Sequence, residues 1–153
     1  MPDQELALKL FIVLSRARNA VADHVDAHTE ACGVTTGEFA VMEALFHKGP
    51  LLLGEVKRKI LVSSGGVTYL IDRLEARGLV ERRACPTDRR ARYAALTQAG
   101  QDLMARIFPE HAGRIVAALG GLNDEEKGRA IELLRTLGLH AEGLAGGARV
   151  GAE

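Results

Sequence analysis

Apolar residues recur every three or four positions over six stretches of the chain, and glycine or polar connections separate these stretches. This spacing puts the apolar side chains of each stretch on one face, which is typical of amphipathic helices packed against a core. The sequence therefore predicts a mainly helical protein. The six stretches lie at about 6–25, 39–46, 54–61, 67–74, 103–119 and 131–137.

Residues that favour helix ends flank several of these stretches. Thr35 and Glu38 have the spacing of a capping box ahead of the second stretch. Ser63 or Ser64 suits the N-cap of the fourth stretch, and Gly78 favours the left-handed conformation that ends such a helix. The fourth stretch is therefore expected to form a short, well-bounded helix.

The last two helices have recognisable starts and ends. Thr97 is expected to cap the fifth helix, which should break before Pro109 because proline cannot donate the helical hydrogen bond. Asn123 is expected to cap the sixth helix, and Gly138 to end it. The Gly/Ala-rich tail at 141–153 is predicted to be disordered.

The periodicity changes to that of strands after the fourth helix. Runs at 79–84 and 92–97 flank a turn at 85–91 that contains proline and aspartate, and 51–53 is expected to form a short strand beside them. Two short helices followed by a hairpin are typical of a helix–turn–helix with a wing. The exposed front of the second of these helices is small and polar, as an element that enters the major groove of DNA must be.

The charge of the chain is unevenly distributed, although its net charge is zero. Residues 54–97 contain ten Lys or Arg and five Asp or Glu, a net charge of +5, so the remainder carries −5. The positive charge coincides with the predicted helix–turn–helix and wing, which favours nucleic acid as a partner.

Five short motifs in this region resemble, in order and spacing, the winged helix–turn–helix of MarR-type (multiple antibiotic resistance) transcriptional regulators. Together with their spacers they cover about a quarter of the chain, residues 64–100. The motifs are Ser64-Gly65-Gly66-Val67-Thr68, Asp72-Arg73-Leu74-Glu75, Arg77-Gly78-Leu79-Val80, Asp88-Arg89-Arg90 and Leu96-Thr97-Gln98-Ala99-Gly100.

The resemblance implies a mainly α fold with a small β-wing, in which the winged helix–turn–helix (34–97) lies between dimerisation helices (4–33 and 98–140). The pattern points the same way, because the first, fifth and sixth helices have more apolar face than one domain needs, and a two-fold interface would bury it. A symmetric dimer should bind double-stranded DNA at a pseudo-palindromic operator with half-sites ~10 bp apart.

The residues expected to meet DNA fall into three groups. Candidates for the major groove are Ser64, Gly66, Thr68 and Tyr69. Candidates for phosphate contacts are Lys57, Lys59, Arg73 and Arg77. Candidates in the wing are Asp88, Arg89, Arg90 and Arg92; in the family, the arginine matching Arg90 enters the minor groove and the aspartate matching Asp88 helps to set the turn. Few of these side chains suit bidentate base reading, so DNA shape is expected to contribute to specificity.

The family's usual mode is repression, often relieved by a small aromatic or phenolic molecule bound between the dimerisation helices and the winged helix. The runs His47–Gly54, Cys85-Pro86 and Ile107-Phe108-Pro109 are similar to the branch that answers catechols, quinones or oxidants. Candidate polar residues for such a pocket are Arg16, His24, His28 and His111.

Two other sensing mechanisms remain as alternatives. His24, His28 and Cys32 are ligand types for zinc, but their ladder spans ~12 Å, so a pair with a remote ligand such as His111 would be needed. A redox switch at Cys32 or Cys85 is the second alternative, with arginines near Cys85 lowering its pKa. An inert cysteine is the preferred interpretation, and no cofactor is expected.

The sequence shows no motif typical of an enzyme and no segment typical of a membrane protein. It has no phosphate-binding loop, nucleophile elbow or zinc-protease motif, no apolar run of membrane-spanning length and no signal peptide, so a cytoplasmic non-enzyme is expected. A winged helix that binds another protein and has no operator is the remaining alternative.

Overall fold

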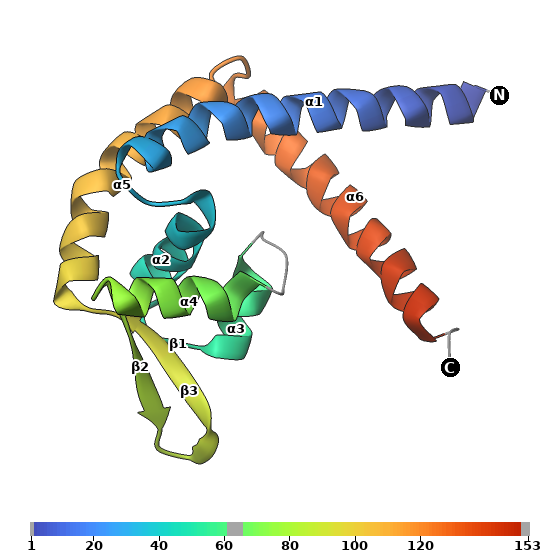
Figure 1. The fold of residues 1–153 in the computed structure, drawn as a ribbon. Coiled ribbons are helices and arrows are strands. Elements are labelled where there is room, and N and C mark those ends of the chain that lie inside the picture. Colours follow the sequence, from blue (N-terminus) through green and yellow to red (C-terminus); the bar gives the residue numbers. More distant parts are fainter. Residues whose placement is uncertain (1, 61–65, 151–153) are drawn as a thin grey trace. The chain divides into compact units, whose positions relative to one another are not determined.

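The computed structural model describes residues 2–60 and 66–150, which form two units, Met1–Ala118 and Leu119–Glu153 (Figure 1). The first unit is mainly helical with a three-stranded antiparallel sheet, so the predicted fold class is confirmed. Its elements are α1 (Pro2–Ala31), α2 (Thr36–Lys48), β1 (Leu51–Leu52), α3 (Leu53–Lys59), α4 (Val67–Ala76), β2 (Val80–Cys85), β3 (Asp88–Leu96) and α5 (Gln98–Ala118). The described part of the second unit contains α6 (Asp124–Val150).

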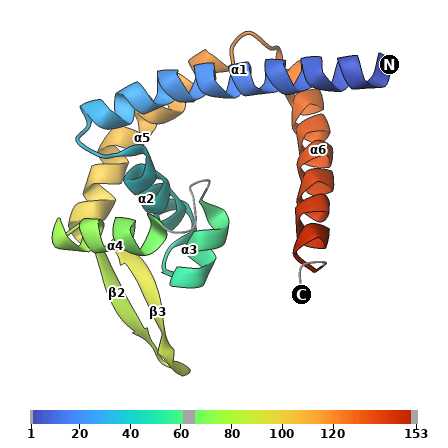
Figure 2. The same ribbon diagram turned by 45° about the vertical axis from the view of Figure 1, so that its right-hand side comes forward.

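The core of the first unit joins α2, α3 and α4 to the sheet and to α5. The three residues Val67, Ile71 and Leu74 are buried on one side of α4, and Leu70 is half-buried beside them, which confirms the predicted apolar stripe. The start of α5 fits closely against this core, because a Cβ at Gly100 would collide with the carbonyl oxygen of Leu79. The C-terminal half of α1 lies along α5, as both views show (Figures 1 and 2). Other buried members include Phe39, Met42, Leu45, Val56, Val80, Leu96, Met104 and Ile107.

The sheet has the order β1-β3-β2, and the short strand expected at 51–53 is present as β1, with Leu51 opposite Ala94. The hairpin turn is tighter than the predicted 85–91, because Cys85 already pairs with Asp88 across Pro86 and Thr87. The pair before it is Ala84 with Arg92, so residues 89–91 form a bulge on β3. A bulge increases the local twist and turns the wing tip away from the plane of the sheet.

The caps expected for α2, α5 and α6 are present, whereas Ser63 and Ser64, the N-cap candidates for α4, lie outside the described residues. Thr35 Oγ1 accepts a hydrogen bond from the backbone N–H of Glu38 (3.1 Å), and Thr97 Oγ1 accepts one from Gly100 (3.1 Å). Gly78 ends α4 with φ of 71°, the left-handed conformation that favours glycine. Asn123 and Glu126 hydrogen-bond each other's backbone N–H groups at 2.9 Å, a complete capping box at the start of α6.

The predicted break in the fifth helix and the predicted end of the sixth are both wrong. α5 continues through Pro109. Proline offers no N–H to the carbonyl of Ala105, but Ala105 is exposed, so water can hydrate this carbonyl. On the opposite face of the helix, Ile107 and His111 are buried and hold it in place. α6 continues past Gly138 to Val150, through most of the tail expected to be disordered. A glycine inside a helix costs only about 1 kcal/mol relative to alanine, and the leucines and alanines around it favour helix.

Large apolar side chains remain exposed on two helices. On α1, six residues between Leu6 and Val13 are 48–68% exposed, and on α6 the exposed set includes Ile131, Leu133, Leu134 and Leu137. None of the helices in the described ranges is both long and apolar enough to cross a bilayer. These apolar faces are therefore left exposed by the described part of the chain.

Candidate nucleic-acid interface

Helix α4 presents a polar front, as predicted for a recognition helix. Thr68, Tyr69 and Arg73 are exposed, opposite the buried stripe of the helix. Gly66 lies directly before the first residue of α4 and has helical φ and ψ of −90° and −16°. Ser64, the expected N-cap and major-groove candidate, lies outside the described residues.

Tyr69 and Arg73 are held together on this front. Arg73 Nη1 donates a hydrogen bond to the Tyr69 hydroxyl (3.3 Å), and its guanidinium lies 5.8 Å from the centre of the tyrosine ring. The pKa of Arg73 is raised, first by this hydrogen bond and by the charge of Tyr69, and then by Glu38. The two side chains therefore act as one unit at the front of the helix.

Helix α4 is also tied to α2, by a contact that the sequence interpretation missed. The carboxylate of Glu38 is buried, and it pairs with Arg77 Nη1 (2.8 Å) and with Arg73 Nη2 (3.6 Å). Glu38 was assigned to a capping box, but its side chain points to α4 rather than back to Thr35. The i, i+4 spacing of Arg73 and Arg77 was the available signal, because it puts two cations on one edge of the helix.

The acidic residues of α4 are neutralised by the wing. Arg82 on β2 donates to Glu75 Oε2 (2.9 Å) and to Asp72 Oδ1, and these hydrogen bonds raise the pKa of Arg82, that to Asp72 most strongly. Without this arginine, two carboxylates would face the phosphates of any DNA bound at α4. Arg82 thus links the wing to α4.

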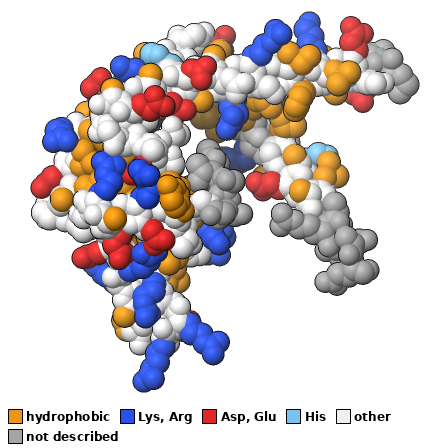
Figure 3. All heavy atoms as spheres, in the orientation of Figure 1, with side chains coloured by type: hydrophobic (Ala, Val, Ile, Leu, Met, Phe, Trp, Pro, Cys, Tyr) orange, Lys and Arg blue, Asp and Glu red, His pale blue; other side chains and the backbone are white. Residues whose placement is uncertain are grey.

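The tip of the wing is basic and exposed, as the lower end of Figure 3 shows. Asp88 Oδ1 accepts a hydrogen bond from the backbone N–H of Arg90 (2.9 Å), so the turn-setting contact implied by the resemblance is present. Arg92 Nη1 donates to the carbonyl oxygens of Arg89 and Ala91, both at 3.0 Å, and so helps to hold the bulge. The exposed side chains of Arg89 and Arg90 extend from this braced turn.

Helix α3 adds further positive charge beside the wing. Lys57, Arg58 and Lys59 are exposed on its last turn. A cleft of about 360 Å³ between α3 and the wing is lined by Arg58, Arg90 and Arg92, among others. Five of the seven predicted basic residues thus lie on α3 and the wing, and the other two, Arg73 and Arg77, lie on α4 or at its end. A phosphate backbone would complement this positive charge.

The four residues expected to form a ligand pocket are not brought together as one group. Arg16 and His24 are exposed on α1, whereas His28 and His111 are buried. Burial lowers the pKa of His111, an effect that Glu43 opposes. His111 packs on Phe39 with their ring centres 4.2 Å apart.

The zinc alternative lacks an assembled site in the part of the chain that the structure describes. His28 Nε2 lies 3.2 Å from Glu110 Oε2 and 3.6 Å from the sulfur of Cys32, while exposed His24 is not part of this group. No cluster of three His, Cys, Asp or Glu side chains suited to a metal ion occurs among the described residues.

Cys85 lies at the wing turn and its pKa is lowered, but the predicted cause is wrong. Its sulfur lies 3.4 Å from the hydroxyl of Thr87, and this hydrogen bond is the largest effect on its pKa. The nearby arginines expected to lower it are bound elsewhere, since Arg82 pairs with α4 and Arg83 with Glu81.

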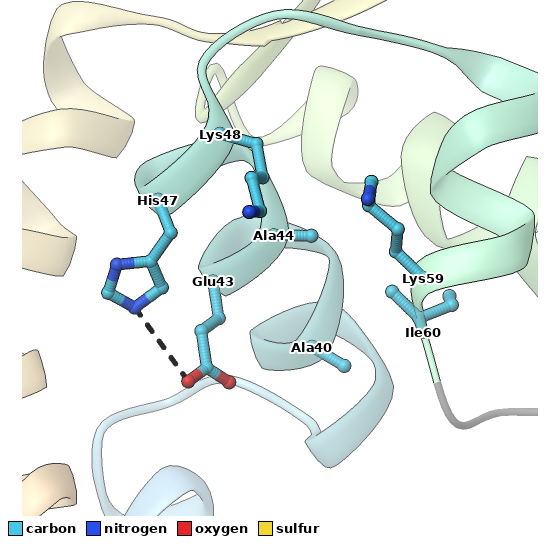
Figure 4. A pocket seen from close by; sticks show the side chains of 7 residues that line it. All are labelled: Ala40, Glu43, Ala44, His47, Lys48, Lys59 and Ile60. Atoms are coloured by element: carbon cyan, nitrogen blue, oxygen red, sulfur yellow. Dashed lines mark ion pairs between the residues drawn. The ribbon is translucent and has the colours of Figure 1, made fainter.

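A second cleft lies between α2 and α3 (Figure 4). Its lining residues do not include the four predicted ligand candidates. It measures about 390 Å³ and has an apolar floor of Ala40, Ala44 and Ile60. Its polar lining residues are Glu43, His47, Lys48 and Lys59; His47 Nε2 lies 3.9 Å from Glu43 Oε1. The cleft thus combines apolar side chains with two amines, an imidazole and a carboxylate.

Known proteins with this architecture are DNA-binding regulators. HTH-type transcriptional regulator MhqR of Bacillus subtilis (strain 168) is 44% identical over 138 residues, 90% of this chain and 95% of that protein. The structure of reduced AbfR bound to DNA is 26% identical, with a TM-score of 0.73 over 92% of this chain and 97% of that one. Bordetella bronchiseptica BpsR, whose DNA binding is regulated by 6-hydroxynicotinic acid, is 29% identical, with a TM-score of 0.73 over 82% of this chain and 90% of that one.

The family model agrees with these similarities and with the geometry of α4 and the wing. The model of the MarR family matches residues 33–91, which include α4, β2 and the first residues of β3. The family consists of transcriptional regulators rather than enzymes, and its members share the helices and the small sheet described above. The chain belongs to the MarR family of DNA-binding, helix–turn–helix transcriptional regulators.

Proposed function

We propose that the chain is a homodimeric repressor that binds a pseudo-palindromic operator in the cytoplasm. The observation that carries this proposal is the braced basic surface, in which α4 and the wing are joined by Arg82 and end in exposed Arg89 and Arg90. Thr68 and Tyr69 would meet base edges in the major groove, while Arg90 would enter the adjacent minor groove. Lys57 would contact phosphates, whereas Lys59 lines the α2–α3 cleft.

The exposed apolar faces support the dimer. Six neighbouring apolar residues on the first half of α1, and a further set on α6, would otherwise stay in contact with water. A single helix face of this kind is normally covered by another element. A two-fold contact would cover both copies with the same residues and set the separation of the two recognition helices.

We further propose that a hydroxylated aromatic acid or phenol relieves repression by binding the α2–α3 cleft. The amines of Lys48 and Lys59 suit a carboxylate or phenolate, and the small side chains of Ala40 and Ala44 leave room for a ring. BpsR supports this class of effector, because 6-hydroxynicotinic acid regulates its DNA binding.

Selection from a random duplex pool tests the operator proposal. The chain should enrich a sequence with two inverted half-sites about one helical turn apart. Enrichment of no sequence, or of a single half-site by a monomer, would refute it.

Displacement from the selected duplex tests the effector proposal, with 6-hydroxynicotinic acid and catechol as probes. At least one should release the wild-type chain, while Ala44→Leu, which fills the cleft, should bind the duplex normally and resist release. Release that Ala44→Leu leaves unchanged would place the effector elsewhere.

A further inference from the structure

A buried acid beneath the recognition helix remains unexplained by helix capping. The Glu38 side chain is 1% exposed, on the first turn of α2. The capping of this turn is already supplied by Thr35, whose hydroxyl accepts the N–H of Glu38. A buried carboxylate is costly unless cations and hydrogen bonds compensate for the lost water. The partners of Glu38 therefore indicate what this residue does.

Both partners lie on α4, four residues apart. Arg77 Nη1 donates to Glu38 Oε2 at 2.8 Å, and Arg73 Nη2 lies 3.6 Å from Glu38 Oε1. Oε1 has no hydrogen-bond partner within the described part of the chain, so it holds Arg73 by charge alone. The carboxylate thus fixes two cations on one edge of the recognition helix.

Both arginines keep part of their guanidinium exposed, with N–H donors that Glu38 does not use. Their side chains are 48% (Arg73) and 38% (Arg77) exposed, and a guanidinium carries five N–H donors, of which Glu38 uses a minority. Arg73 also donates to the Tyr69 hydroxyl at 3.3 Å. A continuous set of contacts therefore runs from buried Glu38 through Arg73 to Tyr69 at the front of α4.

The backbone of α2 lies against a side chain of α4 at the same point. A Cβ placed on Gly37 would lie 3.0 Å from both terminal carbons of Leu70, a separation tighter than ordinary packing. Glu38 follows Gly37 directly, so the position of its carboxylate relative to α4 is set by this close packing. Glu38 can orient the two arginines because the packing of α2 against α4 restricts the position of its carboxylate.

We infer that Glu38 is a positioning residue for sequence recognition, which holds Arg73, Arg77 and, through Arg73, Tyr69 in the direction needed at the operator. This inference rests on the proposed operator binding. Side chains that are already ordered lose less entropy on binding. Arg73 and Tyr69, held in one orientation, should therefore favour the operator sequence that this orientation fits. Binding to random DNA depends on net positive charge instead, and Glu38 reduces that charge.

Glu38→Gln separates these two effects because glutamine keeps the size and one acceptor oxygen but removes the charge. We expect its preference for the selected duplex over a random duplex of equal length to fall about tenfold, equivalent to about 1.4 kcal/mol. Its affinity for the random duplex should stay equal or rise. The matched control is Glu30→Gln, which removes the same charge from an exposed position on α1 and should keep the wild-type preference.

Arg77→Lys provides a second test that leaves Glu38 in place. Lysine keeps the positive charge but lacks the planar fork that bridges a carboxylate and a phosphate. The preference for the selected duplex should fall, while the salt dependence on random duplex stays unchanged. Thermal unfolding followed by circular dichroism establishes the folded fraction of each variant.

Two results would overturn the inference: an unchanged preference in Glu38→Gln, or an equal loss of affinity for both duplexes, as a purely structural role predicts. If the wild-type chain enriches no sequence at all, the proposed function fails and the inference fails with it. If the wild-type chain selects a sequence and Glu38→Gln retains the preference, the inference fails alone.

Discussion

Replacing Arg90 with alanine should reduce the electrostatic part of DNA binding more than replacing Arg83, although both changes remove one formal charge from the wing. Arg90 is exposed at the bulged turn, where its backbone N–H is fixed by Asp88. The guanidinium of Arg83 is already neutralised by Glu81, with both hydrogen bonds to the same carboxylate oxygen at 2.6 and 2.8 Å. The two variants therefore compare a free cation with a paired one on the same hairpin.

The expected magnitude follows from counterion release. Each arginine that neutralises one phosphate contributes about 0.9 to the slope of log K against log [salt], so two Arg90 side chains in a dimer contribute about 1.8. Between about 50 and about 200 mM salt, the wild-type chain should lose about tenfold more affinity than Arg90→Ala. Arg83→Ala should keep a slope close to the wild-type value.

Fluorescence anisotropy with a labelled random duplex, titrated at a series of salt concentrations, measures these slopes. A random duplex is the right probe because it isolates the contacts that do not depend on sequence. Equal slopes for Arg90→Ala and the wild type would refute the assignment of Arg90 to a phosphate or minor-groove contact. An equal decrease in both variants would show that only the total charge of the wing matters.

Three further predictions concern stability and assembly. Gly100→Ala should lower the unfolding free energy in urea by about 3 kcal/mol, because its Cβ would collide with the carbonyl oxygen of Leu79; an unchanged midpoint would contradict the close packing. Burial lowers the folded-state pKa of His111 despite Glu43, so its contribution to stability is present above pH ~6.5 and is lost as the pH falls below that value. The melting temperature should therefore drop less on acidification in His111→Gln than in the wild type, and parallel curves would argue against this. Phe11→Asp should convert the proposed dimer to monomer in sedimentation velocity without unfolding it, whereas a persistent dimer would exclude the first half of α1 from the interface.

Local signals in the sequence were sufficient for the winged helix. The cap at Thr35, the left-handed Gly78 and the turn-setting Asp88 act through residues within three positions of themselves, so their contacts can be predicted from the chain alone. The apolar stripe of α4 was likewise predictable, because helical periodicity directly determines which side chains share a face.

The errors arose where distant packing or helix context outweighs a local preference. Pro109 and Gly138 normally weaken a helix, yet α5 and α6 continue through them. Glu38 matched a local capping motif, but its carboxylate binds arginines 35 and 39 residues away in sequence. No spacing rule within α2 reveals that contact, and Cys85 likewise depends on the actual turn geometry rather than on the arginines that precede it.

Protection of the selected duplex from chemical attack tests the central claim most directly. A dimer that places α4 in the major groove and the wing in the minor groove should protect two major-groove patches about one helical turn apart, each flanked by a protected minor-groove patch. Arg90→Ala should lose the minor-groove protection and keep the major-groove protection. A single protected patch, or protection of phosphates alone with no groove pattern, would contradict the account.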